Sequence, residues 1–176
     1  YRAPTEVEVA AARGAEVPGD LAELSLGPAN QYVAPPRYGL VDFADLFTPR
    51  QLRVLATFSD LVAQNFDEMR AEGARDIWAN AVTTILALGV GQLARFGSSL
   101  SQWRLRATAN AKAEAAFSRA DLPMMWDFAE TNFNGGSVGD WTQICASMTR
   151  AFSFVVSDGV GVVSRKDARV VRSKSG

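Results

Sequence analysis

Two carboxylates three residues apart, Asp127 and Glu130, come closest to a catalytic pair in this chain. A helix is predicted to start at Leu122-Pro123, and on a helix this spacing places both side chains on one face. Paired carboxylates there can perform acid–base chemistry or hold a metal ion. Exposed helix surface is the commoner role of charged residues and explains the pair without any chemistry.

A second constellation is Trp103 with Arg104 and Arg106, in a stretch expected to be irregular. It combines a flat stacking surface with guanidinium groups that bind phosphate, as a nucleic-acid contact requires. A solvated basic loop has the same composition. The basic residues from Arg95 to Arg119 are Arg95, Arg104, Arg106, Lys112 and Arg119, against Glu114 alone.

The sequence gives weak or no evidence for an anion site, a cysteine nucleophile, a catalytic triad or a zinc site. Asn132 to Gly136 could form a backbone nest for an anion, but an ordinary turn has the same sequence. Cys145 lies on an apolar helical pattern, and without histidine in the chain nothing activates its thiol. The lack of histidine also excludes a Ser-His-Asp triad and, with one cysteine, a structural zinc site within these 176 residues.

Composition predicts one folded domain of ordinary size, because 48 % hydrophobic residues can bury a core. The net charge of −1 gives no global attraction to nucleic acid. The single cysteine fits a reducing cytoplasm. The apolar stretch Ala79–Val90 is shorter than a membrane span, so no membrane partner is expected. Since the chain begins at Tyr1, we expect a segment of a longer protein.

The elements that must position these residues are mainly helices. Thr5 and Glu8 form a capping box for a short helix ending near Arg13. Thr48, Pro49 and Gln51 predict the start of a long helix that ends near Gly73. A second long helix, 75–96, is apolar on most sides and is expected to be buried. The short connection between the two predicts an antiparallel hairpin. Trp78, Trp126 and Trp141 are expected in the core.

The predicted fold class is therefore mainly α: an antiparallel helical hairpin core with additional helices and short strands at the C-terminal end. Helices are expected at 107–117, from 122 onward and at 141–154, with a loop at 132–140 and strands at 155–163 and 168–172. The expected organisation is a short helix and Pro/Gly-rich loop at 1–36, a helical domain at 37–154 and a β-rich segment at 155–176.

Two blocks are specific enough to suggest a family: Leu46-Phe47-Thr48-Pro49-Arg50-Gln51-Leu52 and Leu122-Pro123-Met124-Met125-Trp126-Asp127-Phe128-Ala129-Glu130. Shorter stretches accompany them: Tyr1–Glu6, Tyr38–Leu40, Phe58–Val62, Ser98–Leu100 with Trp103, Phe117–Arg119 and Asn132. In this order, over most of the chain, they resemble the large bacterial adenine-specific DNA methylases of the zinc-ribbon type.

The resemblance implies a helical insertion that lies, in that family, between the S-adenosylmethionine-binding glycine loop and the Asp-Pro-Pro-Tyr catalytic motif. Neither motif occurs here, and the zinc-ribbon cysteines are missing too. The segment is thus expected to hold no cofactor or metal and to be inactive alone, with S-adenosylmethionine implied for the parent enzyme. The implied partners are DNA and the rest of the methyltransferase chain.

On this basis the candidate nucleic-acid-binding residues are Arg50, Trp103, Arg104, Arg106 and Arg119, and the candidates for facing the cleft are Trp126, Asp127, Glu130 and Asn132. Capping does not require Arg50, so Arg50→Ala is expected to change the free energy of unfolding by less than about 0.5 kcal/mol.

Two rival functions remain open. The hairpin could be a protein-interaction module that docks on a partner subunit or on a second copy, forming a homo-oligomer without touching nucleic acid. The chain could also be a free-standing small-molecule enzyme, which would need a pocket around Asp127 and Glu130.

Overall fold

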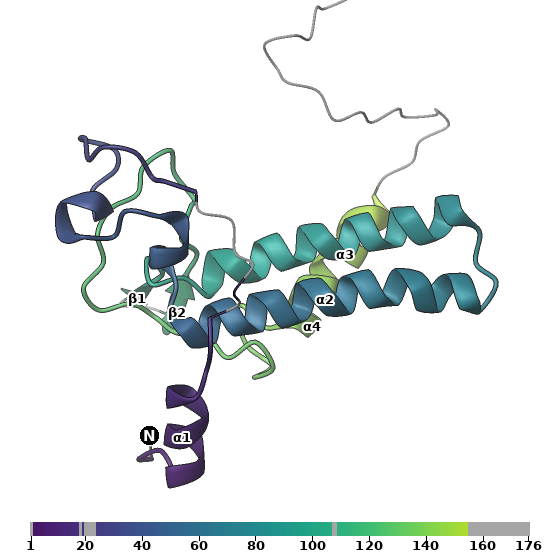
Figure 1. Cartoon of the computed structure of the whole chain (residues 1–176), viewed down its shortest axis with the longest axis horizontal. Coiled ribbons are helices and arrows are strands. Elements are labelled where there is room, and N and C mark those ends of the chain that lie inside the picture. The colour runs from purple at the N-terminus through teal and green to yellow at the C-terminus, as the bar shows by residue number, and fades with distance from the viewer. Residues whose placement is uncertain (1, 18, 20–23, 107–108, 155–176) are drawn as a thin grey trace, which may run out of the picture.

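Two long antiparallel helices form the axis of the structure, a computed structural model that describes residues 2–17, 19, 24–106 and 109–154 (Figure 1). They are α2, Pro49–Ala71, and α3, Asp76–Phe96. Gly73 sits in the connecting turn at φ 93°, a conformation that favours glycine. The predicted helical hairpin and the mainly α fold class are confirmed.

The start of α2 is fixed by the predicted capping box. The Gln51 side chain accepts from the backbone N–H of Thr48 at 2.8 Å, and the Thr48 hydroxyl accepts from the N–H of Gln51 at 3.4 Å. Pro49 occupies the first helical position, where its missing N–H costs nothing. Gln51 is completely buried, so this cap is also part of the packed interior.

Residues 24–48, 97–106 and 109–140 form a head at the end of the hairpin where α2 begins and α3 ends (Figure 1). The head contains two 3₁₀ turns, Pro35–Tyr38 and Phe43–Leu46, and an antiparallel pair of strands, β1 (Gln102–Arg106) and β2 (Ala109–Glu114). Its core is built from Leu46, Leu100 and Ala116, surrounded by Leu26, Leu40, Phe47, Phe117 and Leu122.

The strands correct two predictions. The stretch 103–106, expected to be irregular, is β1, and most of the alanine-rich stretch expected to be a helix is β2. Trp103 lies opposite Ala113, and Arg104 lies opposite Lys112. Helix propensity amounts to a few tenths of a kcal/mol per residue, and pairing with a neighbouring strand outweighs it. The predicted strands 155–163 and 168–172 lie outside the described residues.

The helix predicted from Leu122 onward is also absent from the described structure. The backbone there bonds to distant segments instead. Leu122 donates to the carbonyl of Tyr32 and accepts from the N–H of Ala34, and Ala129 donates to the carbonyl of Ser101 at 2.9 Å. These long-range bonds satisfy backbone groups that a helix would have paired locally.

The expectation that α3 is buried on most sides is wrong. Its buried residues are Ala79, Gly89 and Leu93, whereas Ile77 is 74 % exposed and Leu88 67 % exposed. Trp78 and Trp126, expected in the core, are 63 % and 75 % exposed. Helix α3 is long and apolar enough to cross a membrane by length and composition alone, which is weak evidence from one helix.

Helix α4, Trp141–Ser153, packs against α3 at Gly89. A Cβ atom on Gly89 would lie 3.0 Å from both the Met148 side chain and the Trp141 ring, so glycine permits this close contact. Trp141 is half-buried and stacks at a tilt on Phe58, with ring centroids 4.9 Å apart. The predicted helix at 141–154 and the loop before it are confirmed.

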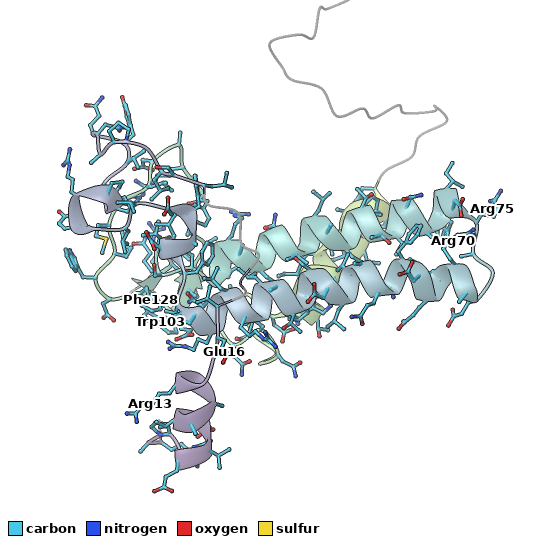
Figure 2. All side chains as sticks on the ribbon, viewed as in Figure 1. Arg13, Glu16, Arg70, Arg75, Trp103 and Phe128 are labelled. Carbon is cyan, nitrogen blue, oxygen red and sulfur yellow. The ribbon has the colours of Figure 1, made fainter. Side chains whose placement is uncertain are left out.

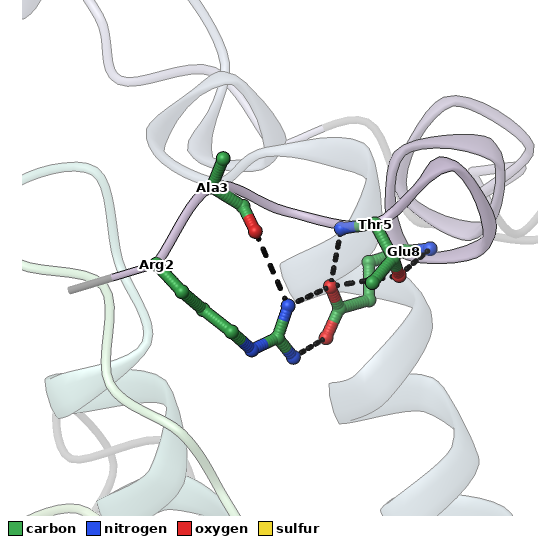
Figure 3. Close-up of polar contacts among 4 residues, drawn as sticks. All are labelled: Arg2, Ala3, Thr5 and Glu8. Carbon is green, nitrogen blue, oxygen red and sulfur yellow. Dashed lines mark hydrogen bonds and ion pairs between the residues drawn. The ribbon is translucent and has the colours of Figure 1, made fainter.

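The short helix α1, Glu6–Arg13, stands clear of the hairpin and has no buried residue (Figure 1). Its predicted capping box is present, and Arg2 reinforces it (Figure 3). The guanidinium of Arg2 donates to Glu8 at 2.5 and 2.8 Å, and the Thr5 N–H donates to Glu8 at 2.7 Å. Together they lower the pKa of Glu8 to about 2.

Candidate functional site

The two most specific sequence blocks meet on the head through one ion pair. Arg50, in the first turn of α2, donates from Nε to Oε1 of Glu130 at 2.5 Å and from its terminal nitrogen to the second carboxylate oxygen. Eighty positions separate the partners in the chain. Arg50, which helix capping does not require, is therefore held in an ion pair, and its pairing with Glu130 raises the pKa of the guanidinium.

Serine side chains that follow α3 bond to the 3₁₀ turn that precedes α2, beside the core of the head. The Leu46 carbonyl accepts from Ser98 Oγ at 3.0 Å, from Ser99 Oγ at 2.9 Å and from the Ser99 N–H at 2.9 Å. Ser101 Oγ donates to the Phe96 carbonyl at 2.9 Å, which satisfies the end of α3. The Ser98–Leu100 stretch therefore has a structural role in holding the start of α2 against the end of α3.

Aromatic rings are exposed on the same head. Trp126 packs edge-to-face on Tyr38, with centroids 5.0 Å apart and planes at 77°. Tyr38 itself is half exposed, in the 3₁₀ turn before Gly39. Sequence reasoning missed Tyr38, although its block was among the matching stretches. The pair offers flat apolar surface to a ligand.

The predicted basic constellation lies on β1. Trp103 is half exposed, and Figure 2 shows it at the head end of the molecule, far from Arg70 and Arg75 at the hairpin tip. Arg104 pairs with Glu114 of β2 at 3.1 Å, so its charge is largely balanced. Arg106 ends β1, and its side chain lies outside the described part of the structure.

The carboxylate pair of the sequence is separated by the structure. Asp127 is exposed and shares no helix face with Glu130, because residues 122–130 are not helical. Glu130 is engaged by Arg50. Among the residues whose placement is described, no three metal-ligating side chains cluster. The arrangement seen here thus lacks the geometry that acid–base work by Asp127 and Glu130 would need.

In the stretch 132–136, a candidate anion nest or ordinary turn, the Gly136 N–H bonds to a carboxylate of the chain itself. Asp140, which is buried, accepts from the Gly136 N–H at 2.9 Å through Oδ2. Its Oδ1 accepts from the N–H groups of Thr142 and Gln143 at 2.7 and 3.2 Å, which caps α4. The bond from Gly136, followed by those from Gln143 and Thr142, lowers the pKa of Asp140. Asp140 was missed as a cap; an aspartate just before a predicted helix was the available signal.

The remaining candidates have simple placements. Asn132 is exposed, and its side chain accepts from the N–H of Asn134 at 3.0 Å, which shapes the loop. Arg119 is exposed and lines a small cavity in the head. Cys145 is half-buried, and burial followed by the charge of Asp140 raises its thiol pKa, in keeping with the inert role expected for it.

No family model matches this chain, and no curated protein or solved structure matches it significantly.

Proposed function

We propose that this chain is a helical accessory segment of an S-adenosylmethionine-dependent, adenine-specific DNA methyltransferase, which helps to position DNA or the target base. The observation that carries the proposal is the Arg50–Glu130 pair. It joins the two blocks on which the family resemblance rests, at a partly exposed position where neither helix capping nor core packing requires it.

Charge on the head supports the same role. Glu130 and Glu114 are balanced by Arg50 and Arg104, which reduces the repulsion that acidic groups would exert on phosphates. Arg119 is exposed and forms no ion pair with a described residue. Basic side chains and exposed rings are the groups that contact the phosphates and bases of DNA.

In this proposal the 176-residue segment helps to position DNA, and the parent enzyme carries out the methyl transfer. S-adenosylmethionine and the catalytic motif belong to the parent chain, whose other parts would cover the exposed face of α3. Such enzymes take the target base out of the stack, and a neighbouring domain that holds the distorted duplex assists that step. Methyl transfer by the 176-residue chain alone would contradict the proposal.

The test is fluorescence anisotropy of a labelled 20-base-pair duplex at salt concentrations from 50 to 200 mM. Trp103→Ala and Arg119→Ala are expected to weaken binding, and Arg119→Ala also to reduce the slope of log affinity against log salt by about 0.9 for a lost phosphate contact. Arg75→Ala, at the opposite tip of the hairpin in Figure 2, is the matched control and should bind like the unaltered chain.

Variants of Arg50 and Glu130 test whether Arg50 contacts DNA. If Arg50 contacts phosphate, Glu130 competes with the DNA for it. Glu130→Gln should then strengthen DNA binding while Arg50→Ala weakens it. Equal affinities for both variants and for the unaltered chain would show that the pair serves folding alone.

The uncovered face of α3 supports a second candidate function. In this alternative the chain is a protein-interaction module that pairs with a second copy of itself. Ile77, Ala81, Thr84, Leu88 and Gly91 are all exposed and recur at helical spacing on one face. Sedimentation velocity of Leu88→Glu against the unaltered chain tests it. A concentration-dependent dimer that Leu88→Glu abolishes, together with no salt-sensitive DNA binding, would favour this function over the first.

A further inference from the structure

One face of α3 is exposed along most of the helix. It is formed by five exposed residues, which we call the α3 seam: Ile77, Ala81, Thr84, Leu88 and Gly91. They are spaced alternately four and three residues apart, which is the heptad spacing that keeps one side of a helix against a partner helix. No charged residue lies between Asp76 and Arg95 in the chain. Since the seam offers no partner for a charge, and an unpaired charge is costly to bury, the surface that covers it must itself be apolar.

Gly91 is the unusual member of the α3 seam. Glycine in the interior of a helix is destabilising relative to alanine, so its presence there needs a reason. At Gly89 the reason is the close contact with α4. At Gly91 no atom of the described structure lies within 4 Å of the place where a Cβ atom would be. The fold of one copy therefore does not require Gly91, whereas a second helix that comes close to the backbone would.

The α3 seam is complementary to itself when two copies run in opposite directions. A two-fold axis at Thr84 places Ile77 of one copy opposite Gly91 of the other, since both lie at the same distance along the helix from Thr84. The same axis places Leu88 opposite Ala81. Each large side chain then meets a small one, as side chains interdigitate in a close-packed interior. A parallel pair would instead set each large residue against itself and leave a gap at Gly91.

The charges at the two ends of α3 favour the same orientation. Asp76 lies in the first turn and Arg95 in the last turn, four residues after Gly91. The Asp76 side chain is 69 % exposed although it pairs with Arg70. In an antiparallel pair the basic end of one α3 meets the acidic start of the other, and the two helix dipoles are opposed as well. A parallel pair would bring like charges together at both ends.

We propose that two copies of this chain pair through the α3 seam as an antiparallel two-stranded coiled coil, with the two-fold axis at Thr84. The inference rests on the second candidate function above and adds the orientation and register of the two helices. A phosphate backbone does not fit this surface, because the seam has no cation to bind it. A lipid surface is apolar, but it has no side chain that would fill the space at Gly91.

Disulfide cross-linking tests the register in a Cys145→Ser chain, which has no other thiol. Oxidation of Thr84→Cys should give a covalent dimer, because the two thiols meet at the axis. A mixture of Ile77→Cys and Gly91→Cys chains should also cross-link, whereas Ile77→Cys alone should not. Ala63→Cys, on the exposed surface of α2, is the matched control and should stay monomeric under the same oxidation.

A packing swap tests the same register without a thiol, by sedimentation velocity over a range of concentrations. Gly91→Leu should weaken association at least about tenfold, because the added side chain takes the space of the partner's Ile77. Ile77→Ala in the same chain should restore most of the association, since the large and small residues have then changed places. Ala63→Leu is the control and should associate like the unaltered chain. Circular dichroism at a dilution where the chain is monomeric should show the same helix content in every variant.

The outcomes separate the register from the dimer itself. A dimer that does not cross-link at Thr84→Cys, that cross-links through Ile77→Cys alone, or that Gly91→Leu leaves unchanged would overturn the inference and keep the second candidate function. A chain that stays monomeric at millimolar concentration would overturn both. If that monomer bound phospholipid vesicles and Leu88→Glu abolished the binding, the seam would be a lipid-binding surface instead.

Discussion

The Arg50–Glu130 pair allows a quantitative test of how the two sequence blocks are held together. The perturbation is a double-mutant cycle of Arg50→Ala, Glu130→Ala and the double variant. Each single change removes one side of a contact that spans 80 positions in the chain. The coupling energy of the cycle isolates the pair from the other effects of each substitution.

The magnitude follows from geometry and exposure. The side chains are 44 % and 35 % exposed, so water and salt screen the charges, and exposed pairs contribute about 0.2–1 kcal/mol. Two parallel hydrogen bonds from one guanidinium place this pair in the upper half of that range. We expect a coupling energy of about 0.5–1 kcal/mol at low salt and less at 1 M salt. The sequence alone predicts a change below about 0.5 kcal/mol for Arg50→Ala, and the ion pair raises that expectation.

Urea denaturation followed by circular dichroism measures the cycle. Arg53→Ala is the matched control, since Arg53 is exposed on the same helix and its side chain forms no ion pair with a described residue. A coupling energy near zero would refute the claim that the pair joins the blocks. A value above about 2 kcal/mol would refute the claim that solvent screens it.

The remaining predictions concern a helix contact and two carboxylates. Gly89→Leu should destabilise the fold by about 1–3 kcal/mol through overpacking against α4. Gly91→Leu, where an added Cβ meets open space, should be neutral or stabilising. Thermal melts compare the two variants, and equal losses of stability would contradict the close contact at Gly89. The pKa of Glu8 is lower in the folded chain than in the unfolded one. The stability that ionised Glu8 contributes to α1 should therefore be complete above about pH 4.5 and be lost as the pH falls toward about 2. Amide NMR shifts of α1 measure this, and an identical titration in Arg2→Ala would contradict the assigned cause. The pKa of Asp140 is also lowered, so its contribution to folding stability should be present at neutral pH and decline in acid. Asp140→Ala should destabilise the fold more than Asp140→Asn, because asparagine keeps an oxygen to cap α4. Equal urea midpoints for the two variants would contradict the capping role of Asp140.

Much of the helical framework could be read from local sequence. The caps at Thr5 and Thr48, the turn at Gly73 and the spacing of apolar residues in α2 involve groups within a few positions of one another. Interactions of this range have the same geometry in any chain with these residues, and the helices and the hairpin follow from them.

The candidate site was less predictable because its contacts are long-range. Propensity favoured a helix over 107–117, yet part of that stretch pairs with β1, and residues 122–130 bond to segments far away in the chain. The Arg50–Glu130 pair and the Tyr38–Trp126 pair also join residues far apart in the chain, so no local sequence pattern predicts them.

Local sequence thus determined where the long helices begin and end and that they form a hairpin. Only the tertiary structure decided which residues of the head meet, which of its charges are paired and which face of α3 stays uncovered. The physical reason is that helix caps and turns are closed by neighbours in the chain, whereas cavities, ion pairs and exposed faces depend on how distant segments pack.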